Sequence, residues 1–171
     1  MPKFEHDKNT KRTDAMWKTQ ITPRFSETDA KGHINNNVVP VWFAAGREAI
    51  FRLFSPDMDF TRVDLIVARI EVDFKAEIHC RTDVEVRTFI RKLGNSSVQI
   101  GHELWQDQHK VAEGTAIMVH FDYQTKQSSP LPDGIRSALQ QHLLESTESN
   151  AQQQGHPDQD IKAEGLSHQL S

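Results

Sequence analysis

The stretch from residue 36 to residue 54 is apolar nearly all round when it is drawn as a helix. Its sequence is NNVVPVWFAAGREAIFRLF, and beyond its asparagines only three positions are polar, namely Arg47, Glu48 and Arg52. A helix with so little polar surface is stable only when it is buried. It can begin at about residue 36 or 37 despite Pro40, because the first four N–H groups of a helix have no partner inside it. The rest of the fold must therefore enclose this helix.

Five segments around the helix have the patterns of β-strands. One precedes it and four follow it, over residues 17–25, 65–78, 82–93, 96–107 and 110–123. The last of these is apolar on both faces, as is typical of a central strand. Short connections between the last four segments predict antiparallel neighbours. On one face of the second segment we expect Ile66, Ala68, Ile70, Val72 and Phe74.

A short helix is predicted over residues 132–144. The order of strand, long apolar helix, four strands and short helix favours one sheet curled around one buried helix, which is an α+β architecture. The chain has 171 residues, which suits one domain with tails. We predict a disordered polar arm over residues 1–15, a folded domain over 16–145, and a disordered polar tail over 146–171, because the two ends are too polar to offset the entropy of ordering them.

Composition excludes several classes of function. The formal net charge is −4 with no basic block, so we expect no nucleic-acid partner. No stretch approaches the roughly 18 apolar residues that a membrane span needs, so we expect no membrane partner. The N-terminus has no apolar signal segment, and the single cysteine, Cys80, fits a reducing compartment, which together favour a cytoplasmic protein. The histidines near the C-terminus lack the spacing of metal ligands, and we expect no metal.

The loop over residues 27–36, ETDAKGHINN, carries the candidate chemistry. Asp29 lies between the end of a strand and the start of the long helix. A helix N-terminus offers free backbone N–H groups and a partial positive charge, which suit a polarised carbonyl oxygen or an oxyanion. A nearby carboxylate can reach the carbon of the same carbonyl. The chemistry suits a thioester, because a thiolate with a conjugate-acid pKa of about 8.5 leaves with little need for protonation. Asp29 can attack that carbon directly or deprotonate water, and both routes stay open.

The sequence FSETDAKGHINN over residues 25–36, followed by the long apolar helix, resembles the hotdog-fold thioesterases of the 4-hydroxybenzoyl-CoA thioesterase-like group. Their pattern runs T-D-x-x-G-H-x-N-N, and the resemblance extends over about residues 16–145. It implies a hotdog fold, in which a five-stranded antiparallel sheet wraps around the helix. It also implies an enzyme that hydrolyses acyl-CoA to a free acid and CoA, with no cofactor other than the CoA of the substrate. Two chains are expected to pair their sheets, with the active sites at that interface, as a homodimer or a dimer of dimers.

The same resemblance assigns roles to individual residues. It places the catalytic acid on Asp29, and the backbone N–H that polarises the carbonyl near Asn36. His33 is a candidate catalytic residue or a residue that hydrogen-bonds its own loop. The candidate substrate contacts are Gly32 in the same turn, Asn35, which is otherwise a helix cap, and Trp42, which is otherwise a core residue. For the CoA moiety, the candidates near the third and fourth strands are Arg91, Lys92, Ser96 and Ser97.

Two alternative functions keep the same fold. An acyl-carrier-protein thioesterase would need a basic patch beside the site, for which Arg87, Arg91 and Lys92 are candidates. A non-catalytic protein that binds acyl thioesters would keep the pocket without turnover. Asp29 argues against the second alternative, because a pure binder has no need for a carboxylate beside a carbonyl.

Overall fold

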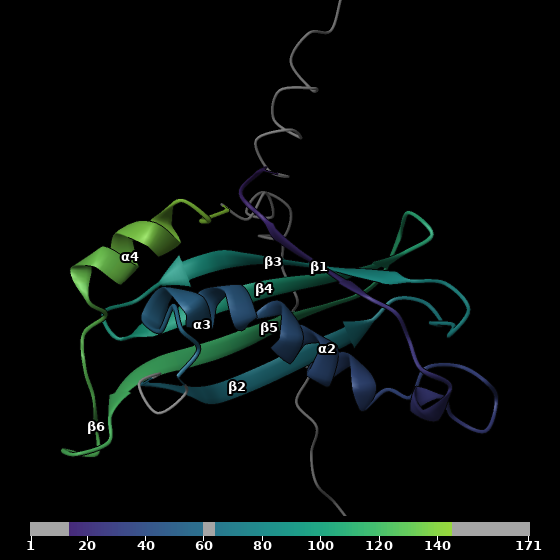
Figure 1. The fold of residues 1–171 in the computed structure, drawn as a ribbon, viewed down its shortest axis with the longest axis horizontal. Coiled ribbons are helices and arrows are strands. Elements are labelled where there is room, and N and C mark those ends of the chain that lie inside the picture. Colours follow the sequence, from purple (N-terminus) through teal and green to yellow (C-terminus); the bar gives the residue numbers. More distant parts are fainter. Residues whose placement is uncertain (1–13, 60–63, 145–171) are drawn as a thin grey trace, which may run out of the picture.

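The computed structural model describes residues 14–59 and 64–144 (Figure 1). Its strands are β1 (Trp17–Ile21), β2 (Leu65–Phe74), β3 (Val84–Leu93), β4 (Ser97–Gln106), β5 (His109–Asp122) and β6 (Gln127–Ser128). Its helices are the short 3-10 helix η1 (Phe25–Glu27) and the α-helices α2 (Val38–Gly46), α3 (Glu48–Phe54) and α4 (Asp133–Gln140). The predicted tail over 146–171 lies outside the described residues, as does the predicted arm over 1–15 except for its last two residues.

The strands form one antiparallel sheet in the order β1-β3-β4-β5-β2, and the two-residue β6 adds to β5. Helices α2 and α3 cross one face of this sheet, which curls around them (Figure 1). Helix α4 lies at the far end of the sheet from the loop that precedes α2 (Figure 1). The predicted arrangement of five antiparallel strands around a central helical segment is therefore confirmed.

The long helix predicted from residue 36 is two helices that are separated at Arg47. Pro40 lies in the first turn of α2, where its missing N–H costs nothing. At the break the backbone N–H of Arg47 donates to Ala44 O at 3.1 Å, three residues back rather than four. The side chain of Arg47 is only 4% exposed and its Nη1 lies 3.4 Å from His102 Nε2 on β4. The break thus occurs where a polar side chain turns into the interior.

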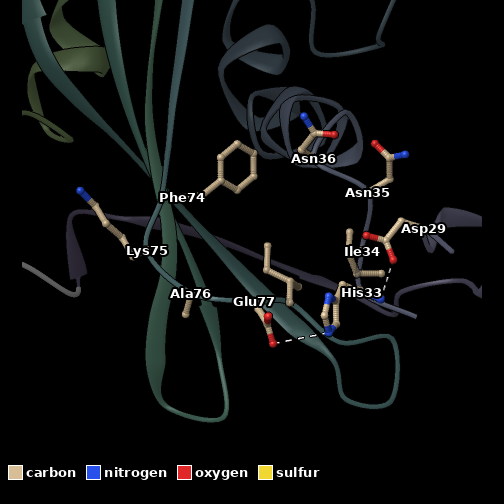
Figure 2. Close-up of a pocket in the computed structure, with 10 residues that line it drawn as sticks. Asp29, His33, Ile34, Asn35, Asn36, Phe74, Lys75, Ala76 and Glu77 are labelled. Atoms are coloured by element: carbon tan, nitrogen blue, oxygen red, sulfur yellow. Dashed lines mark hydrogen bonds and ion pairs between the residues drawn. The ribbon is translucent and has the colours of Figure 1, made fainter. Parts of the chain in front are cut away.

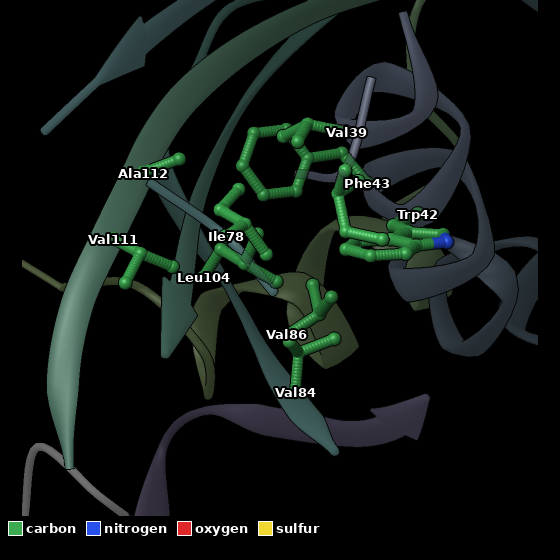
Figure 3. Packing of buried hydrophobic residues seen from close by; sticks show 10 residues of the cluster. Val39, Trp42, Phe43, Ile78, Val84, Val86, Leu104, Val111 and Ala112 are labelled. Atoms are coloured by element: carbon green, nitrogen blue, oxygen red, sulfur yellow. The ribbon is translucent and has the colours of Figure 1, made fainter. Parts of the chain in front are cut away.

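The core consists of two apolar clusters with a polar layer between them. One cluster surrounds α2, with Val39, Trp42 and Phe43 packed on Val84, Val86 and Leu104 of the sheet (Figure 3). The other surrounds Ile50 of α3 and includes Ile90, Val98, Ile100, Met118 and Leu139. Arg47, Thr88 and His102 are buried between the two. Burial, with smaller effects from Arg47 and Arg91, lowers the pKa of His102 to about 3, so its ring is neutral.

Strand β2 contains a bulge between Val67 and Arg69 that changes which residues face the helices. Before the bulge Val67 lies opposite Met118, and after it Ile70 lies opposite Ala116, and both partners are buried in the core. The helix-side face of β2 therefore carries Leu65, Val67, Ile70, Val72 and Phe74. The predicted place of Ile66 and Ala68 on this face is wrong, because the extra residue of the bulge shifts the alternation by one.

The sequence predicts a helix that continues to residue 144, but α4 ends at Gln140 and the segment after it lies along β3. Ile90 N donates to His142 O at 2.9 Å, and Leu144 N donates to Ile90 O at 2.9 Å. The His142 ring stacks on Trp17 of β1 with a centroid separation of 3.6 Å, and its Nδ1 donates to Ala15 O at 2.8 Å. The edge of β3 is thus covered partly by the first strand and partly by the last described residues.

Gly114 allows β5 to pass under α2, and we expect Gly114→Ala to destabilise the fold. A Cβ at this position would lie 2.6 Å from Glu71 O and 2.7 Å from the Phe43 ring. We expect the free energy of unfolding to fall by about 1–3 kcal/mol, measured by denaturant titration. Gly134→Ala in α4 is the matched control, because a Cβ there would meet nothing within 4 Å. Equal stabilities of the two variants would contradict this account of the packing.

Candidate active site

A pocket of about 540 Å³ lies where the loop before α2 meets the end of β2. Figure 2 shows the two walls facing each other, with the ring of Phe74 directed toward the start of the helix. One wall is the loop and consists of Asp29, His33, Ile34, Asn35 and Asn36. The other wall is the segment from β2 onward and consists of Phe74, Lys75, Ala76, Glu77 and Ile78. The pocket therefore brings together most of the loop residues that the sequence singles out.

Backbone hydrogen bonds hold the carboxylate of Asp29 by one of its oxygens. Asp29 Oδ1 accepts from Lys31 N at 2.8 Å and from His33 N at 3.1 Å. Asp29 N donates to His33 O at 2.7 Å, which closes the turn. Within the turn Gly32 has a φ of +82°, a left-handed conformation that favours glycine. No group in the described residues donates to Oδ2, which leaves that oxygen available to a substrate or to water.

The same turn keeps Asp29 ionised. The hydrogen bond from the Lys31 backbone is the largest cause that lowers the pKa of the Asp29 carboxyl below its usual 3.8. Partial desolvation opposes this, while the His33 amide and the nearby charges of His33 and Lys31 lower the pKa further. At neutral pH the side chain is therefore a carboxylate, as either a nucleophile or a general base must be.

The backbone just before α2 has one amide without an acceptor among the described residues. Asn35 N donates to Glu27 O at 2.8 Å, and Asn37 N donates to the Asn35 side chain at 2.9 Å. Val38 N donates to Asn35 O at 2.9 Å. Among these amides, that of Asn36 has no acceptor in the described residues. The Asn35 side chain thus closes a turn just before α2, and both Asn35 and Asn36 line the pocket.

Trp42 lies in the core rather than in the wall of this pocket. Its side chain is 3% exposed, and its Nε1 lies 3.4 Å from Glu27 Oε1. Glu27 Oε2 in turn accepts from Arg24 N at 2.7 Å. Glu27 thereby connects the start of the loop to α2. The only sequence signal for this role is the position of Glu27 three residues after Arg24, which is the spacing of a capping box.

The other wall adds a charged residue that sequence reasoning does not single out. Glu77 Oε2 lies 3.4 Å from His33 Nε2 (Figure 2). The segment reaches the loop because β2 ends in a kink, where Lys75 N and Ala76 N both donate to Val111 O, at 2.9 Å and 3.1 Å. Ile34 N then donates to Ile78 O at 2.8 Å, which joins the two walls. The alternation of residues along β2 does not indicate that the segment after this strand pairs with the loop before α2.

The four residues proposed for the CoA moiety, Arg91, Lys92, Ser96 and Ser97, lie at the opposite end of the sheet within the chain. They belong to the β3–β4 hairpin, where Gly94 N donates to Ser97 O at 2.8 Å. The pocket residue Phe74 pairs with Ala112, which lies level with Leu104 and Val86. Leu93 lies seven residues farther along β3 than Val86, or roughly 23 Å at about 3.3 Å per residue. These residues cannot reach the pocket of their own chain.

Residues 14–59 and 64–144 contain no group of three His, Cys, Asp or Glu side chains arranged to hold a metal ion. In the same ranges, no helix has the length and apolar character to cross a membrane. The cytoplasmic location stays a prediction.

Comparison with known proteins identifies relatives over most of the chain. A 1,4-dihydroxy-2-naphthoyl-CoA hydrolase from Synechococcus elongatus is 27% identical over 131 residues, which cover 74% of this chain and 96% of the hydrolase. Among solved structures, a predicted thioesterase from Bacillus stearothermophilus has a TM-score of 0.74 and 45% identity, with 76% of this chain and 98% of that chain covered. A thioesterase from Thermus thermophilus, complexed with coenzyme A and Zn, has a TM-score of 0.67 and 28% identity, with 74% and 92% covered.

The family comparison extends over the fold and the pocket together. The model of the thioesterase-like superfamily matches residues 23–139, which run from just before η1 into α4 and include the whole Asp29 loop. The hotdog fold and the thioester-hydrolase activity that the sequence predicts are thus confirmed at the level of the family. The match covers well over half of the 171 residues, and the chain belongs to the thioesterase-like superfamily.

Proposed function

We propose that the chain hydrolyses an acyl-CoA thioester to a free carboxylic acid and CoA in the pocket around Asp29. The proposal rests on one observation: the same pocket contains the Asp29 carboxylate and the Asn36 backbone amide, and each has hydrogen-bonding capacity that the described residues do not use. The ionised carboxylate of Asp29 has one oxygen held by backbone amides and the other without a donor among the described residues, and the Asn36 amide has no acceptor in the same part of the chain. The 1,4-dihydroxy-2-naphthoyl-CoA hydrolases and the thioesterase complexed with coenzyme A support CoA as the thiol component.

The proposed reaction places the thioester carbonyl between these two groups. The Asn36 N–H donates to the carbonyl oxygen and stabilises the negative charge that develops there. Asp29 Oδ2 either attacks the carbonyl carbon, giving a mixed anhydride that water then hydrolyses, or takes a proton from a water molecule that attacks the carbon. In both routes the C–S bond breaks, the thiolate of CoA leaves and is later protonated, and the acyl carbon gains the oxygen of water. The geometry suits both routes.

A screen for thiol release tests the proposal and narrows the acyl group. The panel includes short, long and aromatic acyl-CoAs, 1,4-dihydroxy-2-naphthoyl-CoA among them, and the same acyl groups on an acyl carrier protein. Asp29→Ala serves as the blank. Release of thiol by the unchanged protein but not by the blank is the expected result. Equal release by both proteins would refute the assignment of Asp29, and absence of release from the whole panel would favour a protein that binds thioesters without turnover.

The pKa of Asp29 leads to an expected pH dependence. Because its folded-state pKa lies below 3.8, the active carboxylate is present above that pH and is lost as the pH falls through the lowered pKa. We expect kcat/KM to show no acid limb from Asp29 between about pH 5 and pH 7. The measurement is a pH profile of kcat/KM, with circular dichroism at each pH to confirm that the protein stays folded. An acid limb centred above pH 5 that Asp29→Glu shifts would contradict the expectation.

The proposed site also needs a second subunit, since the hairpin candidates for CoA cannot reach the pocket of their own chain. Strand β2 pairs only with β5 among the described strands, and its helix-side face leaves Val67, Ile70 and Phe74 exposed by 47%, 43% and 48%. We propose that two chains pair their β2 edges about a two-fold axis, which makes the paired strands antiparallel. The β3–β4 hairpin of one subunit then lies toward the pocket end of the other.

Disruption of this edge gives a direct test. We expect the unchanged protein to sediment as a dimer or a larger oligomer. We expect Ile70→Asp to sediment as a monomer with reduced thiol release, because pairing of the two edges would remove the new carboxylate from water at a high cost in free energy. Glu71→Ala on the same strand is the control, since its side chain lies on the other face beside Arg69. A monomeric unchanged protein with full activity would refute the shared site.

A further inference from the structure

Glu77 is the one acidic side chain that the wall opposite the loop contributes to the pocket. Its side chain is 69% exposed, and its Oε2 lies 3.4 Å from His33 Nε2. The nitrogen that faces a carboxylate must carry a proton, so Glu77 selects the form of His33 that is protonated on Nε2. The ring is also flanked by His79, at a centroid separation of 5.3 Å and nearly edge-on.

His33 is the residue whose backbone holds Asp29 on both sides. Its N–H donates to Asp29 Oδ1 and its carbonyl accepts from Asp29 N, at 3.1 Å and 2.7 Å. A rotation or shift of His33 would therefore move the carboxylate that faces the substrate. The Glu77 contact adds a polar side-chain link to a wall that also reaches the loop by backbone pairing, through the bridge between His33 and His79 and the hydrogen bond from Ile34 to Ile78.

We propose that Glu77 is a positioning residue for thioester hydrolysis, which acts by holding the His33 side chain and so fixes the turn that presents Asp29. This inference rests on the proposed function of the pocket. An exposed ion pair of this kind adds little to global stability. A displacement of a reacting group by about 1 Å can cost about 100-fold in rate. The effect of Glu77 therefore falls on the chemical step rather than on folding.

The test compares Glu77→Ala with Glu71→Ala, which removes another exposed, ion-paired carboxylate from β2, the strand that precedes Glu77. We expect Glu77→Ala to lower kcat by roughly tenfold with KM and Tm nearly unchanged, and Glu71→Ala to change none of these. In a His33→Gln background, Glu77→Ala should cause no further loss, because its effect passes through His33.

Three outcomes overturn the proposal. They are an unchanged kcat in Glu77→Ala, a loss that appears only in KM or Tm, and a loss of equal size with and without His33. An active Asp29→Ala variant would instead refute the proposed function, so the two failures are distinguishable. The assay uses the full chain and the acyl-CoA that gives the fastest thiol release in the screen.

Discussion

Asp29→Asn is expected to lower kcat for acyl-CoA hydrolysis by about 100-fold or more, the range that loss of a general base gives. This substitution tests the chemical role of the carboxylate more specifically than replacement by alanine does. Asparagine keeps an Oδ1 that can accept from the Lys31 and His33 amides, so the turn retains its hydrogen bonds. The substitution replaces Oδ2 of Asp29 by the amide nitrogen of asparagine. This nitrogen can neither attack a carbonyl carbon nor take a proton from water.

The measurement is kcat and KM from thiol release, together with the Tm of each protein. We expect the Tm to change little, since the Asp29 carboxyl forms no ion pair with another described residue. Asp73→Asn, an exposed carboxyl on β2, is the matched control and should keep full activity. A kcat of Asp29→Asn within tenfold of the unchanged protein would show that another group supplies the base or the nucleophile.

Asn36→Pro is expected to have the second large effect, because it removes one backbone N–H and nothing else that the reaction is proposed to use. Loss of a single oxyanion donor typically costs about 100- to 1,000-fold in kcat. The Asn36 amide has no acceptor within residues 14–59 and 64–144, so its removal breaks no hydrogen bond of the described fold. Proline is also favourable close to the start of a helix, and α2 begins two residues later, at Val38.

Asn36→Ala separates the amide from the side chain. It keeps the N–H and should retain most of the activity, whereas Asn36→Pro should lose it while circular dichroism and Tm show an intact fold. Equal activity of the two variants would refute the role of the Asn36 amide, and equal loss in both would assign the role to the side chain instead.

The overall architecture could be predicted because its determinants are local. The alternation of the strands and the apolar helix are visible within short windows, and their order leaves few ways to cover the helix. The break at Arg47 was not predictable in this way. It accompanies a contact with His102, which lies on a strand far along the chain, and no local pattern encodes that pairing.

The same contrast between local and long-range determinants applies to the residues of the site. Asp29, Gly32, His33 and the Asn36 amide lie within one continuous loop whose turn chemistry is written in adjacent residues, so the sequence locates them together. Glu77 escapes notice because it reaches His33 only after the kink that ends β2. The hairpin candidates for CoA lie far from the pocket because β3 and β4 run away from it, and in the proposed dimer the second chain supplies them.

The shared edge of β3 has a consequence for how the protein folds during synthesis. Ile90 is fully buried, but part of its cover comes from residues 142–144, which leave the ribosome long after β3 itself. Until then the backbone of Ile90 is an open strand edge, the kind of surface that pairs with other nascent chains. The stack of His142 on Trp17 then joins the earliest and the latest described parts of the chain. Closure of this edge is thus a late event in the synthesis of the chain.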